Sequence, residues 1–105
     1  MLTFIQSKLF ARLFSERYSD DDLAELERHL AANPEAGDLV VGSGGVRKMR
    51  WGAPGRGKRG GVRIIYYLKL RREQVWLLTL YAKNQTDSIP GHVLRQIKEE
   101  IDAES

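Results

Sequence analysis

The chain has 105 residues, of which 42% are hydrophobic, and it contains no cysteine. These values predict one domain, residues 1–105, and exclude a disordered chain, a disulfide framework and a thiolate metal site. The net charge of +3 conceals a division, because residues 39–72 hold ten of the seventeen Lys and Arg and no Asp or Glu. A segment this basic predicts a polyanionic partner such as a nucleic acid.

Neither a signal peptide nor a membrane-spanning segment is expected. The first residues, MLTFIQSKLF, do not combine a basic start with a long apolar core. No apolar run approaches the roughly 18 residues that a membrane-spanning helix needs. We therefore expect a cytoplasmic domain without membrane contact.

The N-terminal third predicts a short strand at residues 2–5 and then an antiparallel pair of helices. Ser7 is an N-cap candidate, and apolar residues follow it at helical spacing. Ser19 is a second N-cap candidate, and the three aspartates after it complement the helix dipole. This helix ends near Ala32, because a proline follows two positions later. The apolar stripe of the first helix consists of Leu9, Phe10, Leu13 and Phe14, and the expected buried face of the second consists of Leu23, Leu26 and Leu30.

Three strands are predicted next, at residues 46–51, 62–68 and 75–81, after a polar turn at residues 35–38. Their short connections imply an antiparallel meander. In the first strand, Val46, Lys48 and Arg50 share one face, and in the second, Arg63 shares a face with Ile65 and Tyr67.

A final helix is predicted with Asp87 or Ser88 as its cap and Leu94, Ile97 and Ile101 as its buried stripe. The expected architecture is α+β: a twisted antiparallel sheet, with an N-terminal helical hairpin and a C-terminal helix packed on one face of it.

Arg63 is the most informative single residue, because it lies inside a strand of apolar and aromatic residues. One interpretation is that it projects from the sheet into a site and binds an anion. The alternative is an edge strand from which the side chain reaches solvent. Lys48 and Arg50 are its expected neighbours, and together the three cations would suit a scissile phosphate.

The glycine-rich loop at residues 52–61 allows two interpretations. Its arginines and lysine either keep a solvated connection soluble or neutralise a phosphate chain that approaches the glycine backbone. A nucleotide-binding loop is not expected, because Arg59 stands where a P-loop has Ser or Thr and a strand follows instead of a helix. The three basic residues are Arg56, Lys58 and Arg59.

The remaining candidates favour neither metal nor histidine chemistry. His29 and His92 are expected to be surface or packing residues of helices, and no cluster of ligands predicts a metal site or cofactor. The tyrosines of the two later strands either belong to the core or stack on nucleic-acid bases; they are Tyr66, Tyr67 and Tyr81. At least one of the adjacent pair is expected in the core.

Two blocks of the sequence resemble the RelE/ParE toxin superfamily, and its HigB-type branch most closely. They are the run GRGKRGGVRIIYYL, with GSGGVRKMRW before it, and the run LLTLYAKN, which precedes the final helix. The resemblance spans most of the chain and implies a RelE-like fold. It also implies a type II toxin, a ribosome-dependent endoribonuclease that cuts mRNA in the A site and is inhibited by a cognate antitoxin.

The resemblance also implies roles for residues. Arg63 matches the strand arginine that holds the scissile phosphate, Lys48 and Arg50 match basic catalytic residues of the preceding strand, and Lys83 belongs to a basic pair after the last strand. Asn84 stands where well-known RelE proteins have an arginine, and no tyrosine follows Tyr81 at the place of the family's late catalytic tyrosine. The expected RNA-binding residues are Arg47, Arg56, Arg59, Tyr81 and Asn84.

The expected reaction is metal-independent cleavage by the RNA 2′-hydroxyl. Crowded cations favour the neutral amine of a nearby lysine, so Lys48 or Lys58 is the expected general base. The expected partners are mRNA on the ribosome, ribosomal RNA around the A site, and an antitoxin whose helix-turn-helix part binds operator DNA. Two alternatives stay open: a ParE-like gyrase inhibitor, and a module that binds nucleic acid without cutting it.

Overall fold

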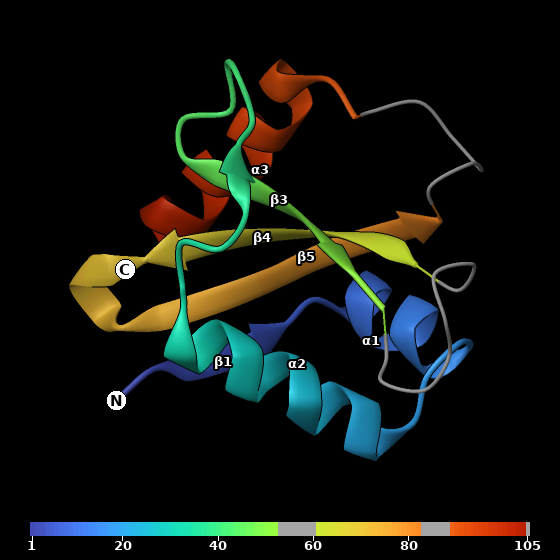
Figure 1. The fold of residues 1–105 in the computed structure, drawn as a ribbon. Coiled ribbons are helices and arrows are strands. Elements are labelled where there is room, and N and C mark those ends of the chain that lie inside the picture. The colour runs from blue at the N-terminus through green and yellow to red at the C-terminus, as the bar shows by residue number, and fades with distance from the viewer. Residues whose placement is uncertain (53–60, 83–88, 105) are drawn as a thin grey trace.

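The computed structural model describes residues 1–52, 61–82 and 89–104. They form the predicted small α+β domain, built on a five-stranded sheet in the order β1-β5-β4-β3-β2 (Figure 1). The elements, in chain order, are β1 (Thr3–Gln6), α1 (Lys8–Ser15), α2 (Asp20–Ala32), β2 (Asp38–Leu39), β3 (Val46–Trp51), β4 (Val62–Lys69), the 3-10 turn η2 (Leu70–Arg72), β5 (Gln74–Ala82) and α3 (Gly91–Ala103).

The sheet confirms the predicted meander and corrects the prediction that all of its strands are antiparallel. β2 to β5 pair antiparallel, but β1 lies beside β5 in the parallel direction, so the sheet is mixed. β2 was not predicted: this two-residue strand begins at Asp38, the last residue of the turn expected at residues 35–38, and pairs with Arg47 and Lys48. Both differences arise because strand pairing is settled by tertiary contacts rather than by local pattern.

Both predicted N-caps of the helical hairpin are confirmed. The Ser7 hydroxyl accepts a hydrogen bond from the Phe10 amide at 2.9 Å and donates one to the Leu78 carbonyl at 2.7 Å, which ties α1 to β5. Ser19 and Asp22 form a capping box at the start of α2. The Ser7 contact fixes α1 against β5, and the capping box fixes the first turn of α2.

The expectation that all helices pack on one face is wrong. The helix residues Phe10, Phe14, Leu26 and Leu30 are buried against one face, whereas Leu94 and Ile101 of α3 are buried against the other. β4 explains this, because its residues are buried on both faces and its apolar run is nearly continuous, as in strands covered from both sides. The face under α3 includes Val46, Ile65, Tyr67 and Leu78.

Helix α3 begins after Pro90, whereas Asp87 and Ser88, the expected caps, lie outside the described residues. Leu94 and Ile101 are buried as predicted, but Ile97 is 36% exposed and lies outside the buried stripe. Leu94 and Ile101 are seven residues, or about two helical turns, apart, so both lie on the side of α3 that faces the sheet. In the described part of the chain, no helix is long and apolar enough to cross a membrane.

Candidate functional site

The register of β3, β4 and β5 brings three of the predicted catalytic residues together. Arg50 lies directly opposite Arg63, and Arg63 lies directly opposite Tyr81. Lys48 precedes Arg50 by two positions and therefore shares its face. Cβ atoms of directly opposed residues are roughly 5 Å apart. We call Lys48, Arg50 and Arg63 the basic cluster, and its predicted adjacency is confirmed.

Exposure and charge distinguish the basic cluster from an ordinary surface. Arg50 is exposed, and Lys48, Arg63 and Tyr81 are half-buried. Within residues 1–52, 61–82 and 89–104, none of the three cations forms an ion pair with a carboxylate. Like charges placed opposite each other in a sheet destabilise it. An anion bound between Arg50 and Arg63 would relieve that repulsion.

The central position of β4 decides between the two interpretations of Arg63. β4 is the middle strand of the five, with β3 on one side and β5 on the other. The edge-strand alternative is therefore wrong. Arg63 projects from the sheet face on which α3 packs.

The basic cluster lies at the end of the sheet where two segments outside the described residues are attached (Figure 1). Trp51, the last residue of β3, pairs with Val62, the first of β4, and Val62 pairs with Ala82 at the end of β5. The described chain is therefore interrupted beside the cluster, between Gly52 and Gly61 and again after Ala82. The other predicted site residues belong to these segments and lie outside the described residues: Arg56, Lys58, Arg59, Lys83 and Asn84.

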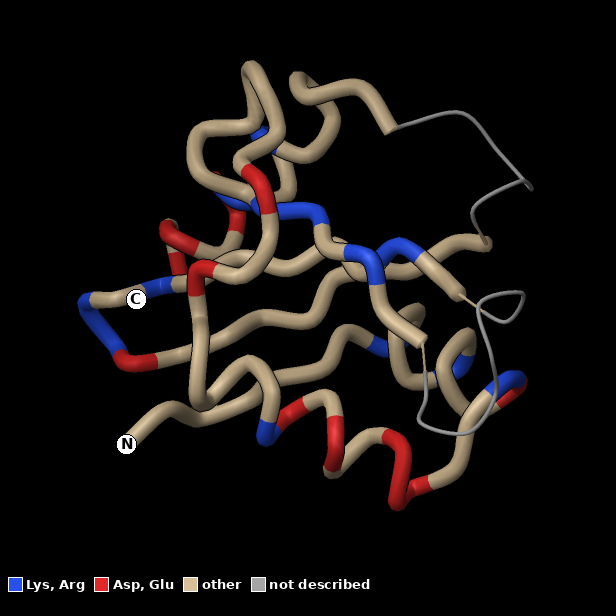
Figure 2. The backbone as a smooth tube through the Cα atoms, in the orientation of Figure 1, with Lys and Arg blue, Asp and Glu red and all other residues tan. Residues whose placement is uncertain are grey.

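Acidic residues are concentrated on two helices. Figure 2 shows them along α2, on the opposite face of the sheet, and along α3, whereas Lys and Arg follow β3 and the start of β4. The first turn of α2 alone carries Asp20, Asp21 and Asp22. The +3 net charge is therefore unevenly distributed over the folded chain, as the sequence predicts.

Arg47 is the one predicted RNA-binding residue that the structure places away from the cluster. It shares a face of β3 with the buried Met49, opposite to Lys48 and Arg50. Its guanidinium donates hydrogen bonds to the Gly37 carbonyl at 2.7 Å and to the Glu35 carbonyl at 3.4 Å. In this position Arg47 holds the turn before β2 against β3.

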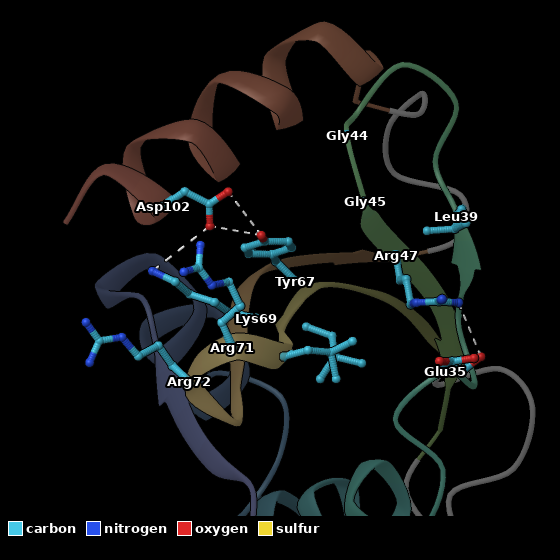
Figure 3. A pocket seen from close by; sticks show the side chains of 12 residues that line it. Glu35, Leu39, Gly44, Gly45, Arg47, Tyr67, Lys69, Arg71, Arg72 and Asp102 are labelled. Carbon is cyan, nitrogen blue, oxygen red and sulfur yellow. Dashed lines mark hydrogen bonds and ion pairs between the residues drawn. The ribbon is translucent and has the colours of Figure 1, made fainter. Parts of the chain in front are cut away.

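A second group of polar and charged residues was not predicted from the sequence. It lies at the opposite end of the same sheet face and anchors α3 to the sheet (Figure 3). The Tyr67 hydroxyl donates to both carboxylate oxygens of Asp102, at 2.9 and 3.1 Å. The ammonium of Lys98 lies 3.0 Å from the same carboxylate, and that of Lys69 donates to the Ile101 carbonyl at 2.9 Å. We call Tyr67, Lys69, Lys98 and Asp102 the anchor network. The alternation that puts Arg63 and Tyr67 on one face also puts Lys69 there, and this was the available signal.

The anchor network shifts the pKa of two of its members. Burial, and next the hydrogen bond to the Asp102 carboxylate, raise the pKa of the Tyr67 hydroxyl to about 12. Burial alone would raise the pKa of Asp102, but hydrogen bonds from Lys98 and Tyr67 and the positive charges of Lys98 and Lys69 outweigh it. The pKa of Asp102 is therefore lowered, and its carboxylate stays charged beside the end of α3.

The histidines lie apart from the basic cluster. His29 is exposed near the end of α2, and His92 is exposed in the first turn of α3. The described residues contain no group of three or more His, Asp or Glu side chains that could hold a metal ion.

The fold and the basic cluster define a small α+β domain with a face suited to a polyanion. The family model that matches residues 3–102 is described as the RelE toxin of the RelE/RelB toxin–antitoxin system. The chain therefore belongs to the RelE toxin family. It is the toxin of a toxin–antitoxin pair, and membership of this family implies a cognate antitoxin as its partner.

Proposed function

We propose that this toxin is a ribosome-dependent mRNA endonuclease of the HigB-type branch, which cuts mRNA in the A site in the cytoplasm and so stops translation. The observation that carries the proposal is the basic cluster, in which Arg50 and Arg63 face each other and neither forms an ion pair with a carboxylate of the described residues. The mRNA strand in the ribosomal A site is a polyanion that suits such a surface. The proposal also fits the family, whose members are toxins of this system.

The proposed reaction is an attack of the RNA 2′-hydroxyl oxygen on the adjacent phosphorus. The new P–O2′ bond forms, the P–O5′ bond breaks, and the products are a 2′,3′-cyclic phosphate and a 5′-hydroxyl. The phosphorane carries two negative charges, and Arg63 and Arg50 stabilise them through its non-bridging oxygens. These cations supply the positive charge, so the proposed mechanism is metal-independent.

The proton transfers use the lysines of the site. Lys48 or Lys58 accepts the proton of the 2′-hydroxyl, and a protonated side chain, with Lys83 as a candidate, donates one to the leaving 5′-oxygen. Tyr81 lies directly opposite Arg63 on the neighbouring strand, and its proposed role is to stack on a base next to the scissile phosphate. Arg56, Arg59 and Asn84 are proposed to hold the RNA on either side of the cut.

Induced expression of the wild type and of Arg63→Ala in a bacterial host tests the proposal, with mRNA 5′ ends mapped after induction. The matched control is Arg12→Ala, which removes an exposed arginine from α1 on the opposite face of the sheet. We expect growth arrest and codon-phased cuts in translated messages with the wild type and the control, and neither with Arg63→Ala.

Other outcomes would point elsewhere. Arrest without cuts would favour the ParE-like inhibitor of gyrase, and RNA binding without arrest would favour a non-catalytic module. Codon-phased cuts that persist in Arg63→Ala would contradict the role assigned to the basic cluster.

A further inference from the structure

The sheet has an incomplete edge at the end opposite to the basic cluster. Pairing of β3 with β4 stops at Val46 and Tyr67, whereas pairing of β4 with β5 continues to Lys69 and Gln74. The last two residues of β4, Leu68 and Lys69, therefore have a strand partner on the β5 side only. An extended segment laid along the line of β3 could pair with this free edge.

A cavity of about 760 Å³ occupies this position (Figure 3). Gly44 and Gly45 form one wall, where the chain turns into β3, and η2 with the end of β4 forms the other. We call this cavity the end groove. Both glycines have positive φ, at 76° and 123°, a backbone conformation that favours glycine at these positions, and neither adds a side chain to the wall.

The end groove has an excess of positive charge. Four cations line it, Arg47, Lys69, Arg71 and Arg72, against the carboxylates of Glu35 and Asp102. The Lys69 ammonium is already held by the anchor network. Arg71 and Arg72 are exposed, and neither forms an ion pair within residues 1–52, 61–82 and 89–104. Their charges are available to a partner.

The groove also has an apolar rim. Leu39 is 59% exposed and Leu70 is 68% exposed, and both line the cavity. A nucleic acid backbone would use the arginines but would gain little from exposed leucines. A peptide with alternating acidic and apolar side chains would use both, because successive side chains of an extended strand point to opposite sides.

We propose that the end groove binds an extended acidic segment of the cognate antitoxin. The segment lies along the free edge of β4, its carboxylates pair with Arg71 and Arg72, and its apolar side chains cover Leu39 and Leu70. Tyr67 and Lys69 are four and six residues beyond Arg63, or roughly 13–20 Å along the strand. The antitoxin therefore gains affinity here without touching the basic cluster, and the proposal rests on toxin–antitoxin pairing rather than on the cleavage chemistry.

The test measures the affinity of purified toxin for the full-length antitoxin encoded beside it. All toxin variants are made on an Arg63→Ala background so that they can be expressed without the antitoxin. We expect the double variant Arg71→Glu/Arg72→Glu to bind at least about tenfold more weakly. The control is the double variant Arg12→Glu/Arg17→Glu, which changes the net charge by the same amount at two exposed positions, one in α1 and one just after it. Its affinity for the antitoxin should change by less than about threefold.

A second pair of variants tests the apolar rim. Leu70→Asp alters an exposed side chain, so the fold should persist and the affinity should fall, whereas Leu9→Asp on α1 should leave the affinity unchanged. Equal affinities of the wild type and Arg71→Glu/Arg72→Glu would overturn the proposal. The proposal would also be overturned if Arg71→Glu/Arg72→Glu bound the antitoxin normally but no longer co-sedimented with ribosomes, because this result would assign the end groove to RNA.

Discussion

The two ends of the sheet face under α3 both carry basic residues, but they differ in what surrounds those residues. At the covered end, Lys69 of β4 donates to the Ile101 carbonyl of α3, and Lys98 of α3 pairs with the Asp102 carboxylate on the same helix. At the other end, Arg50 and Arg63 face each other with no carboxylate paired to them in the described chain. Positive charge that holds the fold together is matched within the protein, whereas the positive charge that we propose for a substrate has no ion pair in the described chain and costs stability.

The largest effect on cleavage is expected from a substitution that gives a carboxylate partner to the arginines that have none in the described chain. Arg50→Glu places a carboxylate directly opposite Arg63, so it should neutralise that guanidinium and repel the scissile phosphate. Removal of one stabilising donor typically slows catalysis by about 10²–10³-fold. A charge reversal should slow it by more than about 10³-fold, measured as single-turnover mRNA cleavage on programmed ribosomes.

The same variant should not lose stability. An opposite-charge pair across two strands should add roughly 0.2–1 kcal/mol to the free energy of unfolding in urea. Arg12→Glu is the control, with unchanged cleavage. If Arg50→Glu cleaved normally, the basic cluster would not be where the phosphate binds.

The covered end should respond in the opposite way. Leu94→Ala removes a fully buried side chain between α3 and the sheet, and such substitutions cost about 2–5 kcal/mol. We expect the free energy of unfolding in urea to fall by about 2–3 kcal/mol, near the lower end of this range. Since α3 is the one helix packed on this face in the described chain, it can shift towards the sheet and partly fill the cavity. Val93→Ala, at a neighbouring position that is 37% exposed, is the matched control. An equal loss in both variants would show that α3 is not docked through Leu94.

A smaller effect is expected in the anchor network. Tyr67→Phe removes the hydroxyl that donates to Asp102 and leaves the ring in place, so it should lower the free energy of unfolding by about 1 kcal/mol. Cleavage per folded molecule should not change. A double-mutant cycle with Asp102→Asn checks the assignment, and additive losses would show that the two groups do not interact.

The stabilisation that Tyr67 provides should also depend on pH. Its folded pKa of about 12 lies above the ordinary value of 10.0, so the stabilisation is complete below pH 10.0 and is lost as pH rises towards about 12. Asp102 has a lowered pKa, so its contribution is complete above its ordinary value and is lost as pH falls through the folded value. The difference between wild type and Tyr67→Phe should therefore shrink in alkali; a constant difference would contradict the assignment.

Local signals in the sequence were enough to predict most elements and to single out the central arginine. Ser7 and Ser19 precede apolar runs at helical spacing, and both are N-caps in the structure. A single arginine in an apolar strand was interpreted either as projecting from the sheet face or as lying on an edge strand, and the middle position of β4 excludes the edge strand.

Pairing and layering could not be predicted in the same way. The register that sets Arg50 opposite Arg63 depends on the connection between β3 and β4, and the parallel pairing of β1 with β5 joins residues about 70 positions apart. The placement of α3 on its own face was predictable in principle, since the nearly continuous apolar run of β4 is typical of a strand buried on both sides.

The most direct test measures cleavage and stability together for Arg63→Ala and Leu94→Ala. Single-turnover cleavage on programmed ribosomes gives the rate per folded molecule, and urea unfolding of the same preparations gives the stability. The predicted result is crossed: Arg63→Ala loses about 10²–10³-fold in rate with no loss of stability, and Leu94→Ala loses stability with an unchanged rate. A full cleavage rate in folded Arg63→Ala would contradict the assignment of the basic cluster to the phosphate.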